Sequence, residues 1–373
     1  MKPTPTALQF LTDALAELDS RGALRRRPAA SAPDAISFCS NDYLGLAART
    51  FEGVAAVGTG ASRLVSGERA EHAQLERALA EWLGMDAALT FSSGYAANVG
   101  AISALASPGD LIVSDALNHA SIIDGARLSR AAVCIVPHLD IGATERALRN
   151  RAAGQRAWVV TESYFSMDAD GPDLAALRRL CDDHGAALVV DEAHALGVLG
   201  PDGRGRCADV GVVPDVLVGT FGKAFGGGGA FVGGCGPLVS WLWNRARSFV
   251  FSTGMSPWLA LAALDALQIS QRQPALRHAV IAATARFREG LASRGIAAVG
   301  FGHVVPWILG SSHRAMTVAG MLRERGIDAA AIRPPSVPDE TARIRFTITA
   351  RHTPALIDTA LAAIEESVRC EAT

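Results

Sequence analysis

The 373-residue sequence predicts an α/β protein with a mostly parallel central sheet, helices on both faces of that sheet and a smaller C-terminal α+β domain. Three observations support this fold class. The length allows two or three domains, and 49% of the residues are hydrophobic, which suits a large buried core. Apolar strand-like runs alternate with helical stretches between residues 110 and 220. Beyond residue 257 the pattern changes to paired helices followed by separate strands.

The first part of the chain predicts a helix, a glycine-rich loop and an anion-binding turn. Residues 5–19 carry leucines at helical spacing, and residues 58–67 are rich in glycine and hydroxyl groups. The elements expected next are a helix at 70–83, a strand at 87–91, a tight turn at 92–95 and a helix at 96–105. A small-residue turn between strand and helix points free N–H groups and the helix dipole at an anion. The turn lacks the G-x-G-x-x-G spacing of dinucleotide sites, so it favours a single phosphate.

The middle of the chain predicts the parallel sheet and the place of its ligand. Strands are expected at 110–114, 131–136, 157–162, 187–191 and 215–220, and helices at 119–129, 142–152 and 173–184. Their short connections imply right-handed crossovers, and ligands on such sheets bind beyond the carboxyl ends of the strands. The polar residues that follow these strands are His119, Glu162, Ser166, Asp191, His194, Thr220 and Lys223. We therefore expect one edge of the sheet to gather them.

The C-terminal part predicts a separate α+β domain. Helices are expected at 257–272, 276–292, 313–325 and 354–369, and strands near 304–309, 327–332 and 342–348. These patterns divide the chain into an N-terminal helix and arm (1–45), a large α/β domain (46–257) and a C-terminal α+β domain (258–373).

Lysine usage singles out Lys223. Of the 35 Lys and Arg residues only Lys2 and Lys223 are lysines, so Lys223 is the single lysine expected within the fold. An amine can lose its proton and attack a carbonyl, which guanidinium cannot do. A biased composition that left one lysine by chance is the alternative. The apolar strand before Lys223 and the glycines after it favour a Schiff-base lysine.

Composition argues against several other classes. A net charge of −2 gives no electrostatic case for nucleic acid or an anionic membrane. The six cysteines lack C-x-x-C spacing, so neither a zinc site nor a disulfide framework is indicated, and a reducing cytoplasm fits best. The two long uncharged stretches are interrupted too often by polar residues, Gly and Pro to span a membrane. Asp191-Glu-Ala-His194 matches a helicase box, but the chain has no P-loop.

The residues expected at the sheet edge suit pyridoxal phosphate. A carboxylate such as Asp191 can hold the pyridine nitrogen protonated, opposite an amine such as Lys223. His119 could stack on the ring, while His194 and Ser166 could reach the 3-hydroxyl group. The amides of Gly94 and Tyr95, with Thr220, could bind the phosphate. Each histidine alone is equally compatible with a purely structural role.

Six motifs in order resemble those of the α-oxoamine synthases. They are Ser40-Asn-Asp-Tyr-Leu-Gly-Leu46, Phe91-Ser-Ser-Gly-Tyr95, Asn118-His-Ala-Ser121, Phe165-Ser-Met-Asp168, Val190-Asp-Glu-Ala-His194 and Thr220-Phe-Gly-Lys223. The resemblance covers residues 20–365. It implies a fold-type I pyridoxal-phosphate enzyme that condenses a small amino acid with an acyl thioester and releases CO₂. Ala23-Leu-Arg-Arg-Arg27 and Ile332-Arg-Pro-Pro-Ser-Val-Pro338 most resemble family members that join L-alanine to a pimeloyl thioester in biotin synthesis.

The resemblance also implies roles for further residues. Lys223 matches the lysine that attaches the cofactor and removes the α-proton, and Arg345 matches the arginine that grips the amino-acid carboxylate, with Asn41 and His119 assisting. Two other positions, Arg25 and Ser336, match substrate contacts. Thr253 matches a hydroxyl that reaches the phosphate across a dimer interface, so a homodimer is expected.

Several alternatives stay open at this point. Arg343 and Arg345 could simply be solvated charges beside a strand. Glycine C-acetyltransferase, which uses glycine and acetyl-CoA, is the same chemistry with smaller substrates, and a catalytically silent scaffold subunit of this fold is a third interpretation. The sequence also leaves open whether coenzyme A or a carrier protein bears the acyl group.

Overall fold

The computed structural model describes residues 6–20, 24–25 and 34–371. Contacts divide the chain into two compact units. The large unit comprises residues 41–282 and 349–351, and the small unit comprises the described residues up to Ser40 together with 283–348 and 352–371. The division therefore falls after residue 282, whereas the change in sequence pattern suggested 257. Lys2, Arg26 and Arg27 lie outside the described residues.

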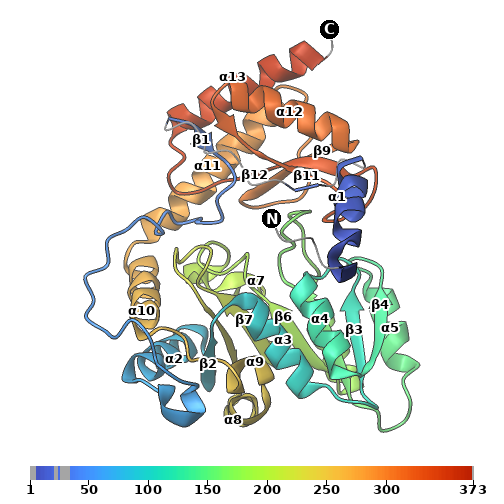
Figure 1. The fold of residues 1–373 in the computed structure, drawn as a ribbon, viewed down its shortest axis with the longest axis vertical. Helices are drawn as coiled ribbons and strands as arrows, with labels where there is room; N and C mark the ends of the chain where they lie inside the picture. Colours follow the sequence, from blue (N-terminus) through green and yellow to red (C-terminus); the bar gives the residue numbers. More distant parts are fainter. Residues whose placement is uncertain (1–5, 21–23, 26–33, 372–373) are drawn as a thin grey trace. The chain divides into compact units, whose positions relative to one another are not determined.

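The large unit is built on the sheet that the sequence predicts. Within residues 41–282 the seven strands lie in the order β2-β8-β7-β6-β5-β3-β4 (Figure 1). Their bounds are β2 Ala87–Phe91, β3 Leu111–Asp115, β4 Ala132–Val136, β5 Ala157–Glu162, β6 Ala187–Asp191, β7 Val216–Thr220 and β8 Ala230–Gly234. The pairs among β3 to β7 are parallel, and β8 is antiparallel to both of its neighbours.

Helices cover both faces of this sheet. Alternate strand residues point to opposite faces, so Val160 and Val189 pack with α3, α4, α8 and α9, while Val159 and Leu188 pack with α6. On the second face α2 and α10 cover the other half of the sheet. The helices are α2 Ala70–Leu83, α3 Gly94–Leu105, α4 Ala120–Ser129, α5 Ile141–Arg149, α6 Leu174–His184, α7 Gly205–Asp209, α8 Gly236–Arg245, α9 Arg247–Val250 and α10 Pro257–Arg272. Short turns of helix also lie at Arg63–Gly67 and Pro201–Gly203.

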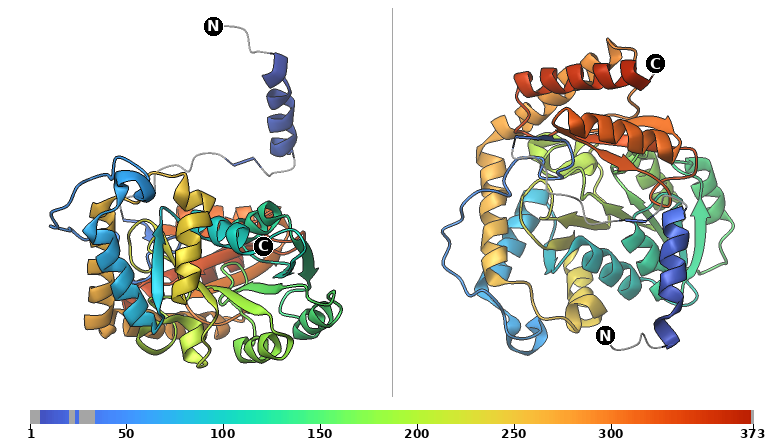
Figure 2. Two further views of the ribbon diagram at one scale, coloured as in Figure 1. Left: turned by 90° about the horizontal axis from the view of Figure 1, so that it is seen from below. Right: turned by 45° about the horizontal axis from the view of Figure 1, so that its top comes forward.

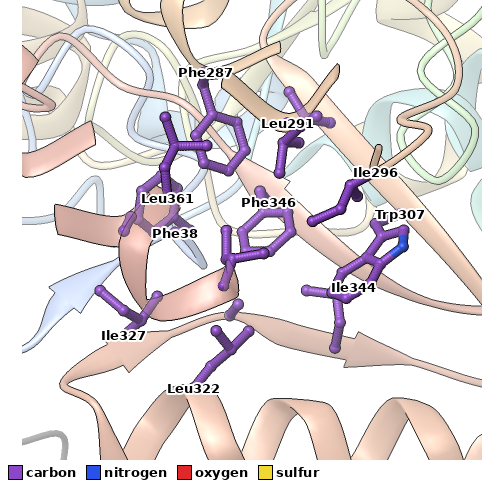
Figure 3. Close-up of a cluster of buried hydrophobic side chains, with 14 of the residues drawn as sticks. Phe38, Phe287, Leu291, Ile296, Trp307, Leu322, Ile327, Ile344, Phe346 and Leu361 are labelled. Atoms are coloured by element: carbon purple, nitrogen blue, oxygen red, sulfur yellow. The ribbon is translucent and has the colours of Figure 1, made fainter. Parts of the chain in front are cut away.

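The small unit has its own sheet and core. Strands β9 Val304–Gly310, β11 Ala330–Ile332 and β12 Ala342–Thr347 form an antiparallel sheet, and β1 Ile36–Ser37 pairs with β10 Ile327–Asp328. The helices are α1 Phe10–Ser20, α11 Pro274–Ala292, which begins in the large unit, α12 Ser312–Glu324 and α13 Pro354–Glu371. Figure 2 shows α12 and α13 side by side. Ile344 and Phe346 on β12 pack with Phe38, Phe287 and Leu361 in a buried cluster (Figure 3).

Most predicted elements are present, and the differences are local. The helix expected at 96–105 begins at Gly94, because the Ser93 hydroxyl accepts the Ala96 N–H and caps it. Strands β1 and β8 and helices α7, α8 and α9 were not predicted. No helix in the described part of the chain is long and apolar enough to cross a membrane. Cys39, Cys134, Cys181, Cys207 and Cys235 are free. No group of three His, Cys, Asp or Glu side chains among the described residues is arranged to hold a metal ion.

Candidate active site

The carboxyl ends of four neighbouring strands bring the predicted polar residues to one edge of the large sheet. Strands β7, β6, β5 and β3 are adjacent and parallel, so their last residues lie at the same edge. Asp191 ends β6 directly beside Glu162, which ends β5. His119 follows β3, and Thr220 ends β7 shortly before Lys223. The topology therefore produces the clustering that the sequence predicts.

A chain of hydrogen bonds fixes the Asp191 carboxylate and the His119 ring. The Asn98 amide donates to Asp191 Oδ2 at 2.7 Å and to Ser121 Oγ at 3.0 Å. Ser121 Oγ lies 2.7 Å from His119 Nδ1, which also accepts the Ser121 N–H at 3.2 Å. Because Nδ1 accepts, the proton of a neutral ring is on Nε2. Asp191 Oδ1 accepts the Ala193 N–H at 2.8 Å, so both carboxylate oxygens are held in place.

His119 stands exposed at the edge with a neutral ring. Desolvation by surrounding atoms lowers the pKa of His119, the Asp191 carboxylate raises it, and the positive charge of Lys223 lowers it again. The net direction is downward, so the ring is uncharged at neutral pH. A neutral imidazole presents an apolar face, which suits stacking on an aromatic ring.

The Glu162 side chain fixes the backbone of His119 through a hydrogen bond. This side chain is buried, and Oε1 accepts the His119 N–H at 2.8 Å. Burial raises the pKa of Glu162 to about 8, with the charge of Asp191 adding to the rise and Lys223 opposing it. Glu162 is therefore mainly protonated at neutral pH.

The start of α3 and the end of β7 form a phosphate-type cradle. Helix α3 begins at Gly94, where unpaired N–H groups and the helix dipole face outward. A Cβ atom added at Gly94 would lie 3.7 Å from Thr220 Cβ and 3.8 Å from its hydroxyl oxygen. The absence of a side chain at Gly94 thus leaves the space beside Thr220 open to an anion.

A tight glycine turn carries Lys223. The Gly226 N–H donates to the Lys223 carbonyl at 2.9 Å, and the Gly227 N–H donates to the Phe221 carbonyl at 2.8 Å. Gly226 has a φ of +59°, and a Cβ there would approach the Ala47 backbone nitrogen to 2.3 Å. Only glycine satisfies both conditions. Lys223 itself is half-buried, within electrostatic range of His119 and Glu162.

His194 has a side-chain partner within the large unit. Its Nδ1 lies 2.6 Å from the Tyr43 hydroxyl, which is 3.4 Å from Asn41 Oδ1. His194 and Tyr43 are buried, whereas Asn41 and Ser166 are partly exposed. The motif that begins at Ser40 is thereby linked to the loop that follows Asp191.

Thr253 is exposed on a segment that a loop of the same unit fixes in place. The Gly254 N–H donates to the Ala61 carbonyl at 3.0 Å, and the Thr59 hydroxyl donates to the Gly254 carbonyl at 3.1 Å. An exposed hydroxyl on a fixed segment is compatible with the expected contact across a dimer interface.

The small unit holds the remaining predicted residues. Arg25 Nη2 donates to Ser336 Oγ at 2.8 Å, so two positions far apart in sequence are brought together. Arg343 and Arg345 share one face of β12, opposite the core residues Ile344 and Phe346. Both arginines are buried, with 2% and 7% of their surface exposed. The interpretation of these two arginines as solvated charges is therefore wrong. Burying a guanidinium group costs free energy unless the group is paired and hydrogen-bonded.

Comparison with known proteins identifies the family. The profile of aminotransferase class I and II matches residues 33–364. The chain belongs to this family. It is 46% identical to the 8-amino-7-oxononanoate synthase of Anaeromyxobacter dehalogenans over 88% of this chain and 85% of that protein. A protein of the same name from Geobacter sulfurreducens is 44% identical, over 92% of this chain and 91% of its own length.

Solved structures agree with this family assignment. The serine palmitoyltransferase of Sphingomonas wittichii superposes with a TM-score of 0.90 at 27% identity, and the match covers 99% of each chain. An 8-amino-7-oxononanoate synthase from Francisella tularensis superposes with a TM-score of 0.77 at 26% identity, over 92% of this chain and all of that one. The fold is fold-type I, and the cofactor of the chain is pyridoxal phosphate.

The residues of the large unit fit this cofactor. The cradle between Gly94 and Thr220 suits a phosphate, and Asp191 is a fixed, buried carboxylate that suits a protonated ring nitrogen. The neutral ring of His119 and the amine of Lys223 lie at the same edge of the sheet. The contacts of these side chains with the cofactor remain predictions.

Sequence reasoning missed the groups that hold the predicted residues. Asn98 stands one turn into α3, and no spacing in the sequence links it to Asp191, 93 positions later. Ser121 and Tyr43 were noticed only as letters of motifs, and Glu162 only as a polar residue after a strand. The sequence shows only that Asn98 is a polar residue in a mostly apolar predicted helix, and its burial is a finding of the structure.

Proposed function

We propose that the chain condenses L-alanine with a pimeloyl thioester to give 8-amino-7-oxononanoate, CO₂ and the free thiol carrier, as a pyridoxal-phosphate-dependent acyltransferase of biotin biosynthesis. A C–C bond forms between the alanine α-carbon and the thioester carbonyl, the thiolate leaves, and the alanine carboxylate departs as CO₂. The observation that carries this proposal is the 46% identity to an 8-amino-7-oxononanoate synthase. The position of Lys223, Asp191 and His119 at one edge of the sheet supports it.

Lys223 and Asp191 carry the proton and charge work in this proposal. Bound pyridoxal phosphate supplies an electron sink for the electron pair of each bond broken at the alanine α-carbon. Lys223 attaches the cofactor and, once released from it, takes the α-proton at Nζ. Asp191 keeps a proton on the pyridine nitrogen, and Asn98 holds its carboxylate in one orientation. A silent scaffold would not need this arrangement.

The other large-unit residues position the cofactor. The Gly94 and Tyr95 amides and the Thr220 hydroxyl bind its phosphate at the start of α3. His119 stacks on the ring as a neutral imidazole, which its lowered pKa favours. His194 and Ser166 contact the 3-oxygen, with His194 held by Tyr43.

Residues of the small unit bind the substrates. Arg345 holds the alanine carboxylate through two parallel charge-assisted hydrogen bonds, a geometry that a planar guanidinium provides. Asn41 is a further substrate-binding residue in this proposal. Arg25 and Ser336, which are hydrogen-bonded to each other, contact the substrate as a pair.

The active form in this proposal is a homodimer in the cytoplasm. The exposed Thr253 reaches the phosphate bound by the partner subunit, so each site uses both chains. The free thiols of Cys39, Cys134, Cys181, Cys207 and Cys235 are consistent with a reducing compartment. Neither a nucleic acid nor a membrane takes part.

A substrate panel tests the proposed reaction. Purified protein with cofactor is given L-alanine or glycine, each with pimeloyl-CoA or acetyl-CoA, and the products and CO₂ are measured by mass spectrometry. Lys223→Ala is the control. We expect kcat/KM for L-alanine with pimeloyl-CoA to exceed that of every other pair by at least about tenfold. Preference for glycine and acetyl-CoA would assign a glycine C-acetyltransferase instead, and no product from any pair would leave a silent subunit.

A further inference from the structure

His138 lies between two aspartates near the carboxyl edge of the large sheet. It follows β4, and its Nδ1 is 2.8 Å from Asp115 Oδ1 at the end of β3. Its Nε2 is 3.2 Å from both carboxylate oxygens of Asp170, in the loop after β5. The Phe165 ring meets the imidazole edge-on, with 4.5 Å between centroids. His138 thus joins segments that follow three different strands.

Asp115 shapes the turn that leads to His119. Its Oδ1 accepts the Leu117 N–H at 2.8 Å, and its backbone carbonyl accepts the Asn118 N–H at 3.3 Å. The other carboxylate oxygen accepts the Leu139 N–H at 2.9 Å. Asp115 therefore fixes the direction of the turn and the loop of His138 together.

Asp170 closes the turn that contains Ser166. The Phe165 N–H donates to the Asp170 carbonyl at 2.8 Å, and the Ala169 N–H donates to the Phe165 carbonyl at 2.9 Å. Ala169 has a φ of +56° and Leu139 a φ of +58°. A non-glycine residue rarely adopts such a φ, so surrounding contacts must hold both turns in these conformations.

His138 forms ion pairs with two aspartates and stays protonated. Burial alone would lower the pKa of His138, but the hydrogen bonds and negative charges of Asp115 and Asp170 outweigh it and raise the pKa to about 10. Both ring nitrogens are then donors, one to each aspartate. At neutral pH the three residues form a fixed bridge between the two turns.

We propose that His138 is a positioning residue for the cofactor site, because its bridge from Asp115 to Asp170 sets the His119 turn and the Ser166 turn at a fixed separation. This inference rests on the proposed function, in which those two turns contact the ring and its 3-oxygen. His138 itself touches neither cofactor nor substrate. Its role is to hold the turns of His119 and Ser166, which follow different strands, in fixed positions relative to each other.

The test compares His138→Gln with a matched ion-pair variant. Arg178 also lies between two aspartates of the large unit, Asp182 and Asp215, each at 2.7 Å, and Asp215 precedes β7 at the opposite edge of the sheet. Arg178→Gln therefore removes a similar pairing without touching either turn. For both variants we would measure cofactor affinity by absorbance titration, unfolding by urea, and kcat and KM for L-alanine.

We expect His138→Gln to bind pyridoxal phosphate at least about tenfold more weakly and to lower kcat by about 10- to 100-fold, with little change in KM, because small displacements of contacting groups have effects of this size. Arg178→Gln should change stability alone. Asp170→Asn should reproduce the weaker cofactor binding, and its effect should not add to that of His138→Gln.

Unchanged cofactor affinity in both His138→Gln and Asp170→Asn would overturn the proposal, as would an equal loss in Arg178→Gln. If His138→Gln does not fold, Asp170→Asn alone decides the outcome. Cofactor affinity requires no substrate, so this result is separate from a failure of the proposed reaction.

Discussion

The native protein should become less stable as pH rises, because the buried Glu162 carboxyl group then ionises. Replacing Glu162 by glutamine should abolish this pH dependence. Glu162 is buried at the end of β5, next to Asp191, and its carboxyl oxygen accepts the His119 N–H. A glutamine carbonyl can accept the same N–H while it carries no charge at any pH. The variant should therefore keep the local geometry and lose the titration.

The magnitude follows from the raised pKa. The pKa of Glu162 is raised from 4.5 to about 8, so the folded state binds a proton that the unfolded state releases. A group of this kind favours folding at low pH, and its contribution is lost as pH rises from the unfolded value toward the folded one. Between about pH 5.5 and about pH 7.5 the native protein should lose about 2–3 kcal/mol of unfolding free energy relative to Glu162→Gln.

The assay is urea unfolding of both proteins at these two pH values. Both are used without cofactor, since a ligand that binds only the folded state adds its own free energy. Glu162→Ala is the control: it leaves the His119 N–H without an acceptor and should cost about 1–3 kcal/mol relative to Glu162→Gln at either pH. A difference between native protein and Glu162→Gln that stays constant with pH would refute this reasoning.

Three further outcomes are expected at the site. Asp191→Asn should retain the cofactor and lose at least about 100-fold in kcat, because the ring nitrogen loses its charged partner; near-native turnover would contradict the electron-sink role. Arg345→Lys keeps the charge but loses the planar fork, so KM for L-alanine should rise at least about tenfold with cofactor affinity unchanged, whereas Arg343→Lys on the same strand face should not do this. Mixed dimers of Lys223→Ala and Thr253→Ala chains should regain part of the activity, and verified heterodimers without any recovery would argue against shared sites.

The sheet could be predicted from the sequence because its parallel strands are local apolar runs. Strands β5 and β6 have the predicted bounds, since β-branched and apolar residues alternate with clear turn signals there. Strand β8 was missed because two of its five residues are glycines, which read as loop. The structure explains them: a Cβ at Gly233 would meet Met85 Sδ at 2.7 Å, and one at Gly234 would meet Leu238 Cδ2 at 2.4 Å.

Some residues of the site could also be predicted from the sequence, and others could not. Lys223, Asp191 and His119 could be found because each follows a recognisable strand, and parallel strands end at a common edge. Asn98 and the bridge of His138 could not, because their contacts join positions dozens of residues apart and depend on how the turns pack. The burial of Arg343 and Arg345 was likewise invisible, since strand alternation places them on one face without saying what covers it.

The most direct measurement is covalent labelling of Lys223. The central claim is that the carboxyl edge of the large sheet binds pyridoxal phosphate through this lysine. Purified protein should be yellow, and borohydride reduction followed by proteolysis and mass spectrometry should find the cofactor on the peptide that contains Lys223. Lys223→Ala should carry no such label. A label on Lys2, or none on Lys223 in protein that binds the cofactor, would contradict the account.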